Sequence, residues 1–587
     1  MITLTIDGIE VKVKEGTSVL DACREAQVIV PTLCKHPDLE ATAACGICIV
    51  KINGRMLRSC CTPVAEGMQV ITRDPDIMKA RKTVVELILS RHPNDCLSCL
   101  KNGNCELQDL AREFSLDKDT FKNITPSEKE MPIDDSTGCI QIDPRKCVQC
   151  GRCVQVCQNV QNVYALSSLK RGINTRMAPA GDLPLDDSPC IKCGQCSAHC
   201  PTGAITEVDE TGKVWDYLQD TTKTCVVQIA PAVRVALGEA LGEAFGYKSG
   251  DLVTGKIYAA LRRMGFKAVF DTNFAADLTI MEEGSEFVRR FTKEPERLPL
   301  ITSCCPAWVD YLEKVDHDMI DNFSTAKSPQ AMLGAVAKTY YAEKIGVDPK
   351  DMIVVSIMPC TAKKWEIKRS KEMFHDGVQN IDVSLTTREL VRMIKQMGVD
   401  FNALPDEKAD SPLGTYSGAG TIFGFSGGVM EAALRTAPYL ITGQEMENLE
   451  FDEITNLNEG AKEMTLNIAG NEIHIAVAHG IKNVSSVLEK VRRAKANGEK
   501  TPYDFIEVMA CPGGCVGGGG QPLGVTDTVR KARQAGLMND DRKSKVRCSH
   551  QNPDIQKLYK EFLGEPLSEK AEELLHTHYT ARPLYNK

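Results

Sequence analysis

The sequence has few aromatic residues, no long apolar run and no excess of positive charge. Of its 587 residues, 5% are aromatic and three are tryptophan, and acidic side chains outnumber basic ones to give a net charge of −9. This balance argues against a protein that binds nucleic acids. No stretch approaches the roughly 18 uninterrupted apolar residues that a membrane-spanning helix requires.

Two further absences concern targeting and nucleotide binding. The chain starts with alternating strand-like residues, without the basic and apolar segments of a secretion signal, so a cytoplasmic protein is expected. No G-x-G-x-x-G dinucleotide fingerprint is present, so a nicotinamide site is expected on another protein. The length suggests about four domains, and the composition, 42% hydrophobic and 25% charged, is typical of globular proteins.

Cysteine, in contrast, is abundant, with 25 residues in the chain. Many are separated by only two or three residues. In a long chain without a secretion signal, such clusters indicate metal or redox ligands rather than disulfides. Soft thiolates favour iron–sulfur or zinc sites over sites for hard cations.

Residues 1–78 are predicted to form a small β-rich module. Apolar and polar residues alternate on either side of Asp7-Gly8, which is a strong signal for a hairpin. The cysteine spacing, C-x10-C-x2-C-x11-C, resembles the plant-type [2Fe–2S] ferredoxin set, whose first gap is usually shorter. The predicted ligands are Cys34, Cys45, Cys48 and Cys60. Zinc is the alternative for this module alone, and Cys61 competes with Cys60 as the fourth ligand.

Residues 79–125 contain a histidine placed a short loop before three cysteines. The spacing is H-x3-C-x2-C-x5-C, and the predicted [4Fe–4S] ligands are His92, Cys96, Cys99 and Cys105. Imidazole in place of a thiolate makes a cluster less negative, so it should raise the reduction potential. A purely structural role for the histidine is the alternative.

Residues 126–209 contain an internal repeat. The spacing C-x2-C-x2-C-x3-C begins at Cys147 and recurs 43 positions later at Cys190, and it is typical of bacterial ferredoxins with two [4Fe–4S] clusters. In such proteins the fourth cysteine of each run crosses to the other cluster. The predicted sets are Cys147, Cys150, Cys153 with Cys200, and Cys190, Cys193, Cys196 with Cys157.

The three modules together are expected to conduct electrons through four clusters in series, which implies chemistry at one end. From residue 210 the sequence changes character, because strand-like runs such as 351–359 alternate with amphipathic stretches such as 387–398. This pattern indicates α/β layers with parallel strands. The expected fold class is multi-domain α+β and α/β: a β-grasp [2Fe–2S] module, a His/Cys3 module, a two-[4Fe–4S] module, and a large two-lobed α/β catalytic domain over 210–587 that includes a C-terminal tail.

Cysteines in this last part occur in three separated loops, with the sequences TSCCPAW, MPCTAKKWE and EVMACPGGCVGGGGQP. Two of the loops follow strand-like runs, where open α/β sheets place their ligands. Four thiolates can come from these loops: Cys305, Cys360, Cys511 and Cys515. The glycine run Gly517–Gly520 permits unusual backbone angles and close approach of N–H groups to an inorganic group; a flexible linker is the alternative.

These three loops resemble the signatures of [FeFe]-hydrogenases, and nearly the whole chain follows the multi-cluster members of that family. The resemblance implies an H-cluster, in which a [4Fe–4S] cubane is joined through one cysteine to a two-iron unit with CO, cyanide and an azadithiolate bridge. By motif position the four cysteines named above hold the cubane, and Cys515 also bridges to the two-iron unit. The implied reaction is the reversible conversion of two protons and two electrons to H2.

Other residues match active-site positions of the family. Lys363 matches a lysine that pairs with a cyanide, and a cation beside an anionic ligand is favourable in a dry pocket. Pro231 and Ala232 match a backbone segment near the other cyanide, where some relatives have serine in place of the alanine. Matching residues expected around the cofactor are Met358, Met509, Gln330 and Ser417.

The resemblance also implies a proton path to the surface. Its members are Cys304, Glu283, Ser324, Glu286 and Arg290. Adjacent side chains point in different directions, so Cys305 can bind iron while Cys304 stays a free thiol that holds a proton. Glu283 and Glu286 are three residues apart and share a helix face, although spacing alone would favour an exposed acidic turn. No role is predicted for Cys61, Cys139, Cys225 and Cys548.

Two other classes of protein are alternatives. Residues 1–209 also resemble the cluster-bearing subunit of respiratory NADH dehydrogenases, but such an electron-transfer subunit needs none of the three catalytic loops. A hydrogen sensor typically lacks the proton-carrying thiol, and Cys304 is present. The expected partners are ferredoxin, NAD(P)-linked flavoprotein and Fe–S subunits, and maturation enzymes. The direction of the reaction is left open.

Overall fold

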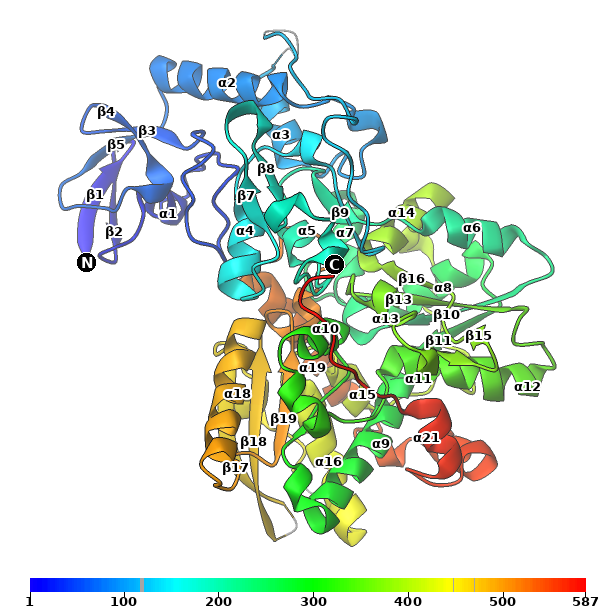
Figure 1. Cartoon of the computed structure of the whole chain (residues 1–587). Helices are drawn as coiled ribbons and strands as arrows, with labels where there is room; N and C mark the ends of the chain where they lie inside the picture. Colours follow the sequence, from blue (N-terminus) through cyan, green and yellow to red (C-terminus); the bar gives the residue numbers. More distant parts are fainter. Residues whose placement is uncertain (117–120, 447, 469, 587) are drawn as a thin grey trace.

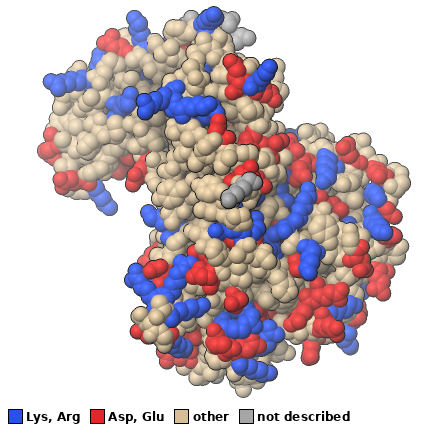
Figure 2. All heavy atoms as spheres, viewed as in Figure 1, with Lys and Arg blue, Asp and Glu red and all other residues tan. Residues whose placement is uncertain are grey.

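The computed structural model describes residues 1–116, 121–446, 448–468 and 470–586. The cysteine-rich modules lie at one end of the molecule, and the rest of the chain forms two lobes at the other (Figure 1). Acidic and basic side chains are interspersed over the face shown in Figure 2. Within the described ranges, no helix is both long and apolar enough to cross a bilayer.

The N-terminal module is a five-stranded sheet with the order β2-β1-β5-β3-β4. The first two strands pair antiparallel, and both residues of the connecting turn, Asp7 and Gly8, have positive φ, as the predicted hairpin requires. Helix α1 (Val19–Glu25) follows them. The strands are β1 (Ile2–Ile6), β2 (Ile9–Val13), β3 (Ile49–Ile52), β4 (Arg55–Arg58) and β5 (Gln69–Ile71).

The ferredoxin-like module preserves its sequence repeat in three dimensions. Each C-x2-C run turns at a left-handed glycine, Gly151 or Gly194, and continues into a short helix, α4 (Arg152–Gln155) or α5 (Gln195–His199). Strands β6 (Ile140–Ile142) and β9 (Ile205–Glu207) pair across the module. The His/Cys3 segment lies between helices α2 (Pro75–Ser90) and α3 (Glu106–Glu113).

The first catalytic lobe contains a parallel sheet with the order β11-β10-β13-β16. All residues of β13 are buried, as expected for a parallel strand that is covered on both faces. Helix α14 (Thr387–Met397) begins with a capping box at Thr386 and Glu389. The strands are β10 (Thr224–Ile229), β11 (Ala268–Asp271), β13 (Met352–Met358) and β16 (Val383–Thr386).

The second lobe contains a sheet with the order β12-β19-β18-β17, parallel except at the β17 edge. Helix α9 (Thr272–Lys293) starts at the end of β11 in the first lobe and packs on α16 (Gly428–Thr442) of the second. The two-lobed α/β prediction is therefore confirmed. The strands are β12 (Leu300–Ile301), β17 (Ala461–Ile468), β18 (Asn471–His479) and β19 (Phe505–Met509).

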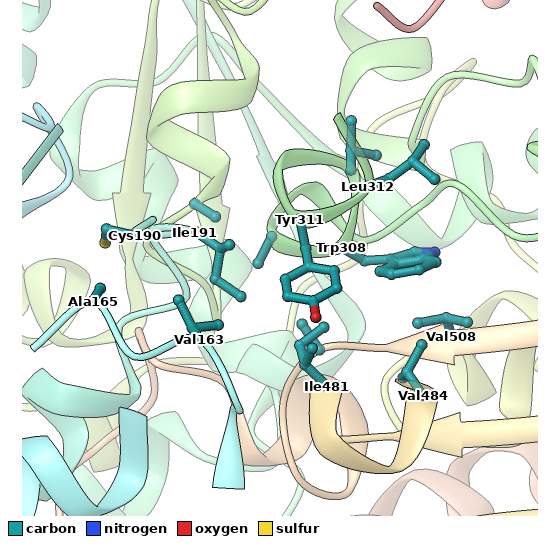
Figure 3. Packing of buried hydrophobic residues seen from close by; sticks show 14 of the residues in the cluster. Val163, Ala165, Cys190, Ile191, Trp308, Tyr311, Leu312, Ile481, Val484 and Val508 are labelled. Atoms are coloured by element: carbon teal, nitrogen blue, oxygen red, sulfur yellow. The ribbon is translucent and has the colours of Figure 1, made fainter. Parts of the chain in front are cut away.

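One hydrophobic core joins the ferredoxin-like module to the second lobe. Ile191 of the ferredoxin repeat belongs to the same buried cluster as Trp308 on helix α10 (Pro306–Lys314) and Ile481 on helix α18 (Ile481–Ala496). Figure 3 shows these side chains around Tyr311, with Ile191 on one side of it, Trp308 on the other and Ile481 below. The ferredoxin-like module and the catalytic domain are thus packed together through a shared core rather than connected only by a linker.

The glycine run after Cys515 lies inside this junction. A Cβ at Gly519 would overlap the carbonyl oxygen of Cys193, and one at Gly518 would overlap that of Pro359. No residue of Gly517–Gly520 has positive φ. The expectation of unusual backbone angles is therefore wrong. Glycine is needed here because other backbone segments occupy the space of a side chain.

We predict that Gly519→Ala lowers the free energy of unfolding by about 1–3 kcal/mol, because the added methyl group overpacks a site that is closed by backbone. Gly212→Ala is the matched control. No atom lies within 4 Å of its Cβ position, and alanine is the better helix former there. Anaerobic urea unfolding compares the two, and equal transition midpoints would contradict the packing argument.

Candidate active site and cluster-binding motifs

A cavity of about 80 Å³ lies where the three catalytic loops converge. Cys305 caps the start of α10 just after β12, Cys360 follows β13, and Cys511 and Cys515 follow β19. All four line the cavity. Since these strands end at the same region of the two lobes, residues distant in sequence reach one site, as is general for open α/β sheets.

The cavity wall is mostly apolar. Met358, Met509 and Pro231 line it, as predicted, and Lys363 is its only charged residue among those described. Ala232 lies just behind the wall, and its carbonyl oxygen accepts a hydrogen bond from Gln521 Nε2 at 3.0 Å. Cys304 adds a fifth thiol to the lining. An apolar pocket with several thiols and one ammonium suits an anionic, thiolate-bound inorganic group.

Glu366, which sequence reasoning missed, organises the polar side of the cavity. Its Oε2 accepts hydrogen bonds from Lys363 Nζ, Gln330 Nε2 and Ser328 Oγ, each at 2.8 Å. Burial disfavours the charged lysine, but the Glu366 carboxylate beside it raises the pKa of Lys363 above its ordinary value. Lys363 is thereby kept as a cation. The only sequence signal was the spacing of three residues on a short helix.

Cys304 and Cys305 differ in their surroundings although both line the cavity. Cys305 Sγ accepts a hydrogen bond from the Ala510 N–H at 3.5 Å, and the Cys304 carbonyl accepts one from Lys363 Nζ at 3.3 Å. The Cys304 thiol belongs to the edge of the apolar cluster of the second lobe. Burial raises the pKa of Cys304 well above its ordinary value.

Glu283 lies between Cys304 and the rest of the predicted proton path. Its side chain is 1% exposed, and neither carboxylate oxygen makes a hydrogen bond of good geometry with the described residues. Burial raises the pKa of Glu283 to about 8, although the nearby Ser324 hydroxyl and Ser303 N–H favour the ionised form. A carboxyl group in this position is protonated at neutral pH.

Glu286 connects the remaining members. Its Oε2 accepts from Ser324 Oγ and the Thr325 N–H, both at 3.0 Å, and its Oε1 accepts from Arg290 at 2.5 Å. Arg290 also donates to the carbonyl oxygens of Asn322 and Phe323. The structure thus brings the five predicted path residues into one neighbourhood along α9.

One expectation about this path is wrong. Arg290 was expected at the surface, but its side chain is completely buried. The loop 322–323 and the C-terminal segment cover this region: Tyr579 donates to the Ser324 carbonyl at 3.0 Å, and His576 contacts Thr325 at 2.7 Å. The covering segment is distant in sequence, so local spacing could not reveal it.

Ser417, predicted near the cofactor, does not line the cavity. It caps helix α15 (Gly418–Ile422), and its hydroxyl and its N–H donate to Asp277 at 2.5 and 2.7 Å. Ser417 therefore links the start of α15 to helix α9 and does not contact the cavity.

The N-terminal cysteines converge in a similar way. The Cys34 thiol contacts those of Cys45 and Cys60, and the Cys60 thiol also contacts that of Cys48. These contacts lower the pKa of Cys34 and raise the pKa of Cys60. Cys61 is exposed at the surface. The structure therefore groups Cys60 rather than Cys61 with the other three.

The other accessory motifs also fit clusters. His92 Nε2 is buried without a hydrogen-bond partner among the described groups, and burial lowers the pKa of His92 to about 4, which leaves a neutral imidazole available to a metal. In the ferredoxin-like module, one cavity is lined by a run of three cysteines together with the crossing fourth, as predicted: Cys147, Cys150, Cys153 and Cys200.

The contacts between modules contradict a simple series. Thr42 of the [2Fe–2S] loop donates to the Cys150 carbonyl at 2.9 Å, and Lys101 of the His/Cys3 loop donates to the Cys200 carbonyl at 3.0 Å. Both N-terminal modules therefore adjoin the same ferredoxin set. The other set contacts the catalytic loops, because Cys193 packs on Gly519. The cluster-binding motifs are therefore branched, because both N-terminal modules contact one ferredoxin set.

Comparisons with known proteins agree with this arrangement. Residues 223–519 match the family "Iron only hydrogenase large subunit, C-terminal domain", and residues 527–582 match "Iron hydrogenase small subunit". Residues 1–75 match a 2Fe-2S iron-sulfur cluster binding domain, 81–119 an NADH-ubiquinone oxidoreductase-G iron-sulfur binding region, and 146–205 a 4Fe-4S dicluster domain.

Similar proteins cover the whole chain. The "NADP-reducing hydrogenase subunit HndD" of Solidesulfovibrio fructosivorans is 46% identical over 99% of both chains, and "Iron hydrogenase 1" of Clostridium pasteurianum is 38% identical over 99% of this chain and 100% of its own. A solved apo structure of the [FeFe]-hydrogenase HydA1 from Chlamydomonas reinhardtii, with one substituted residue, is 42% identical, covers 64% of this chain and 100% of its own, and has a TM-score of 0.56.

The fold and the site thus define an iron–sulfur oxidoreductase that acts on H2. The chain belongs to the iron-only, or [FeFe], hydrogenase family, in the form that carries accessory iron–sulfur modules and an H-cluster.

The buried Glu283 predicts a pH-dependent loss of stability. Its pKa rises from an ordinary 4.5 to about 8, so between these values the folded chain keeps a proton that the unfolded chain releases, and stability falls as pH rises. Glu283→Gln should exceed the wild type in thermal midpoint by a larger margin at pH 8 than at pH 5. Equal margins would contradict this burial cost, and exposed Glu296→Gln serves as the control.

Proposed function

We propose that the converging loops hold the H-cluster through Cys305, Cys360, Cys511 and Cys515, with Cys515 as the bridge to the two-iron unit. The observation that carries this assignment is that these four thiols, from three separated loops, line one apolar cavity together with Cys304 and with Lys363 as the one cation among its described residues. When bound, the H-cluster, with its CO, cyanide and azadithiolate ligands, supplies the metal chemistry that interconverts protons, electrons and H2.

The protein's own residues hold this group and exclude water. Lys363, kept charged by Glu366, would offer an ammonium to a cyanide. The backbone of Pro231 and Ala232 would hold the other cyanide, and Gln521 fixes that segment by donating to the carbonyls of Ala232 and Cys515 at 3.0 and 3.3 Å. Met358 and Met509 would surround the two-iron unit with flexible, polarizable side chains, and Gln330 orients Glu366.

Protons reach the site through side chains that can hold them. Cys304 holds a proton on its neutral thiol, and Glu283 is next, because its carboxyl group is protonated at neutral pH and the Ser324 hydroxyl lies beside it. Ser324 Oγ hydrogen-bonds to Glu286, which Arg290 pairs. Each group lies near the next, as proton transfer requires.

Four accessory clusters deliver electrons. We propose one [2Fe–2S] cluster in residues 1–78, one His/Cys3 [4Fe–4S] cluster in 79–125, and two [4Fe–4S] clusters in 126–209, ahead of the catalytic domain. The relative named as a subunit of an NADP-reducing hydrogenase supports exchange of electrons with NAD(P)-linked partner subunits. We propose a cytoplasmic location for the chain. Ferredoxin is the other candidate partner.

The cluster inventory predicts the iron content. One [2Fe–2S], three accessory [4Fe–4S] clusters and the H-cluster amount to about 20 irons per chain. Protein produced without the dedicated maturation enzymes should keep all but the two-iron unit and be inactive. Anaerobic elemental analysis measures this, and a preparation that contains chiefly zinc would contradict the proposal.

The two adjacent cysteines should respond differently to substitution. Cys304→Ala should keep every cluster and lose nearly all turnover, whereas Cys304→Asp, which can still carry a proton, should keep some activity. Cys305→Ala should disrupt the H-cluster itself because it removes a ligand. Hydrogen-evolution assays alongside infrared spectra of the CO and cyanide bands separate these results. Normal bands with near-normal activity in Cys304→Ala would place the proton path elsewhere.

A further inference from the structure

Lys101 is a buried lysine between two cluster-binding motifs. It lies on the loop between Cys99 and Cys105, and only 5% of it is exposed. Its Nζ donates to the carbonyl oxygen of Cys200 at 3.0 Å. The side chain therefore crosses from the His/Cys3 module to a ligand of the ferredoxin-like module.

Lys101 has no carboxylate partner within 4 Å among the described residues. Most other buried lysines have one, and Lys327, which donates to the Leu574 carbonyl oxygen, is an exception. Lys192 and Lys314 lie 3.1 and 3.5 Å from Asp310, and Lys364 lies 2.9 Å from Glu389. Burial of an ammonium without a counter-ion costs several kcal/mol. A charged Lys101 would therefore be stabilised by negative charge that no carboxylate among the described residues supplies within 4 Å.

The nearest acidic residue on the same segment is already engaged. Glu106 accepts from Arg152 at 2.6 and 2.8 Å, while its N–H donates to the Pro201 carbonyl at 3.0 Å and fixes the two modules together. Glu207 also faces Lys101, but it is paired with Arg388 and Arg392, each at 2.7 Å. The thiols of Cys105 and Cys200 are therefore the remaining groups beside Lys101 that can carry negative charge.

Packing holds the loop that carries Lys101 close to the ferredoxin turn. A Cβ on Gly203 would lie 2.5 Å from Cys99 Sγ and 3.7 Å from Lys101 Cβ. The two cysteine sets thus approach each other with the lysine at their boundary. The [2Fe–2S] module reaches the same ferredoxin set through different groups, Thr42 Oγ1 and the Lys35 carbonyl.

We propose that Lys101 is the counter-ion shared by the His/Cys3 cluster and the ferredoxin cluster that includes Cys200, and that its positive charge raises the reduction potential of both. The proposal rests on the proposed function, in which both sets bind [4Fe–4S] clusters. Reduction adds one electron, and so one negative charge, to a cluster. The ammonium keeps its three protons in both states and stabilises the reduced one.

Three substitutions separate charge from hydrogen bonding and packing. Lys101→Met removes the charge at similar volume, Lys101→Gln keeps a hydrogen-bond donor without charge, and Lys101→Arg keeps the charge. Lys79→Met on α2, where the side chain is exposed, is the control for the same charge change in solvent. The measurement is an anaerobic redox titration of the accessory [4Fe–4S] signals by electron paramagnetic resonance on the holoenzyme.

In the Met variant and in the Gln variant, the reduction potentials of two clusters should each fall by at least about 59 mV. This shift corresponds to a tenfold change in a one-electron equilibrium. Lys101→Arg and Lys79→Met should match the wild type. If the Met variant loses a cluster while Arg keeps it, the counter-ion role is also supported. Unchanged potentials in Met and Gln, or wild-type potentials in Gln alone, would overturn the proposal, as would cluster loss in both Met and Arg.

Iron content and hydrogen evolution with a small artificial donor, measured on the wild type, report separately on the proposed function. A wild-type chain without the His/Cys3 cluster would mean that the proposed function fails for that module. A wild-type chain with all its clusters and unshifted variants would mean that only the role of Lys101 fails.

Discussion

The cysteine loops of the catalytic domain and of the ferredoxin-like module meet by direct contact between their backbones. Gly518, Gly519 and Gly520 lie against the backbones of Pro359, Cys193 and Cys360, so three segments that carry cluster ligands meet with no side chain between them. Electrons pass between clusters only over short distances, and this close packing is the most direct way for a chain to shorten them. The shared hydrophobic core of Ile191, Trp308 and Ile481 holds the junction rigid.

Buried charge is the second feature that the clusters explain. Lys363 is paired by Glu366 and faces a cavity with five thiols, Lys101 lies between two cysteine sets, and Glu283 has no charged partner of opposite sign among the described residues. Each would be costly in an apolar interior. Lys363 is balanced by Glu366, Lys101 lies beside the thiols of two proposed cluster sites, and Glu283 avoids the cost by remaining neutral at pH 7.

The sequence predicted the parts of this arrangement that depend on local spacing. The grouping of Cys200 with the run from Cys147, the hairpin at Asp7-Gly8 and the convergence of the three catalytic loops were predictable, because ligand spacing and strand patterns are local signals. The roles of Glu366 and Lys101, the burial of Arg290 and the branched arrangement of the cluster-binding motifs were not, because each depends on contact between segments distant in sequence. The glycine run was predicted to allow close approach, but the approaching group is backbone.

The contacts between the modules predict that electrons from both N-terminal modules reach the H-cluster only through the ferredoxin set Cys190, Cys193, Cys196 and Cys157. A double variant, Cys190→Ala with Cys196→Ala, removes that cluster and leaves the outer ligands in place. Rapid reduction of the accessory clusters by a photochemical donor, followed by infrared detection of the H-cluster state, measures the transfer. In the double variant, the outer clusters should become reduced while the H-cluster stays oxidised. Reduction of the H-cluster at the wild-type rate would contradict it.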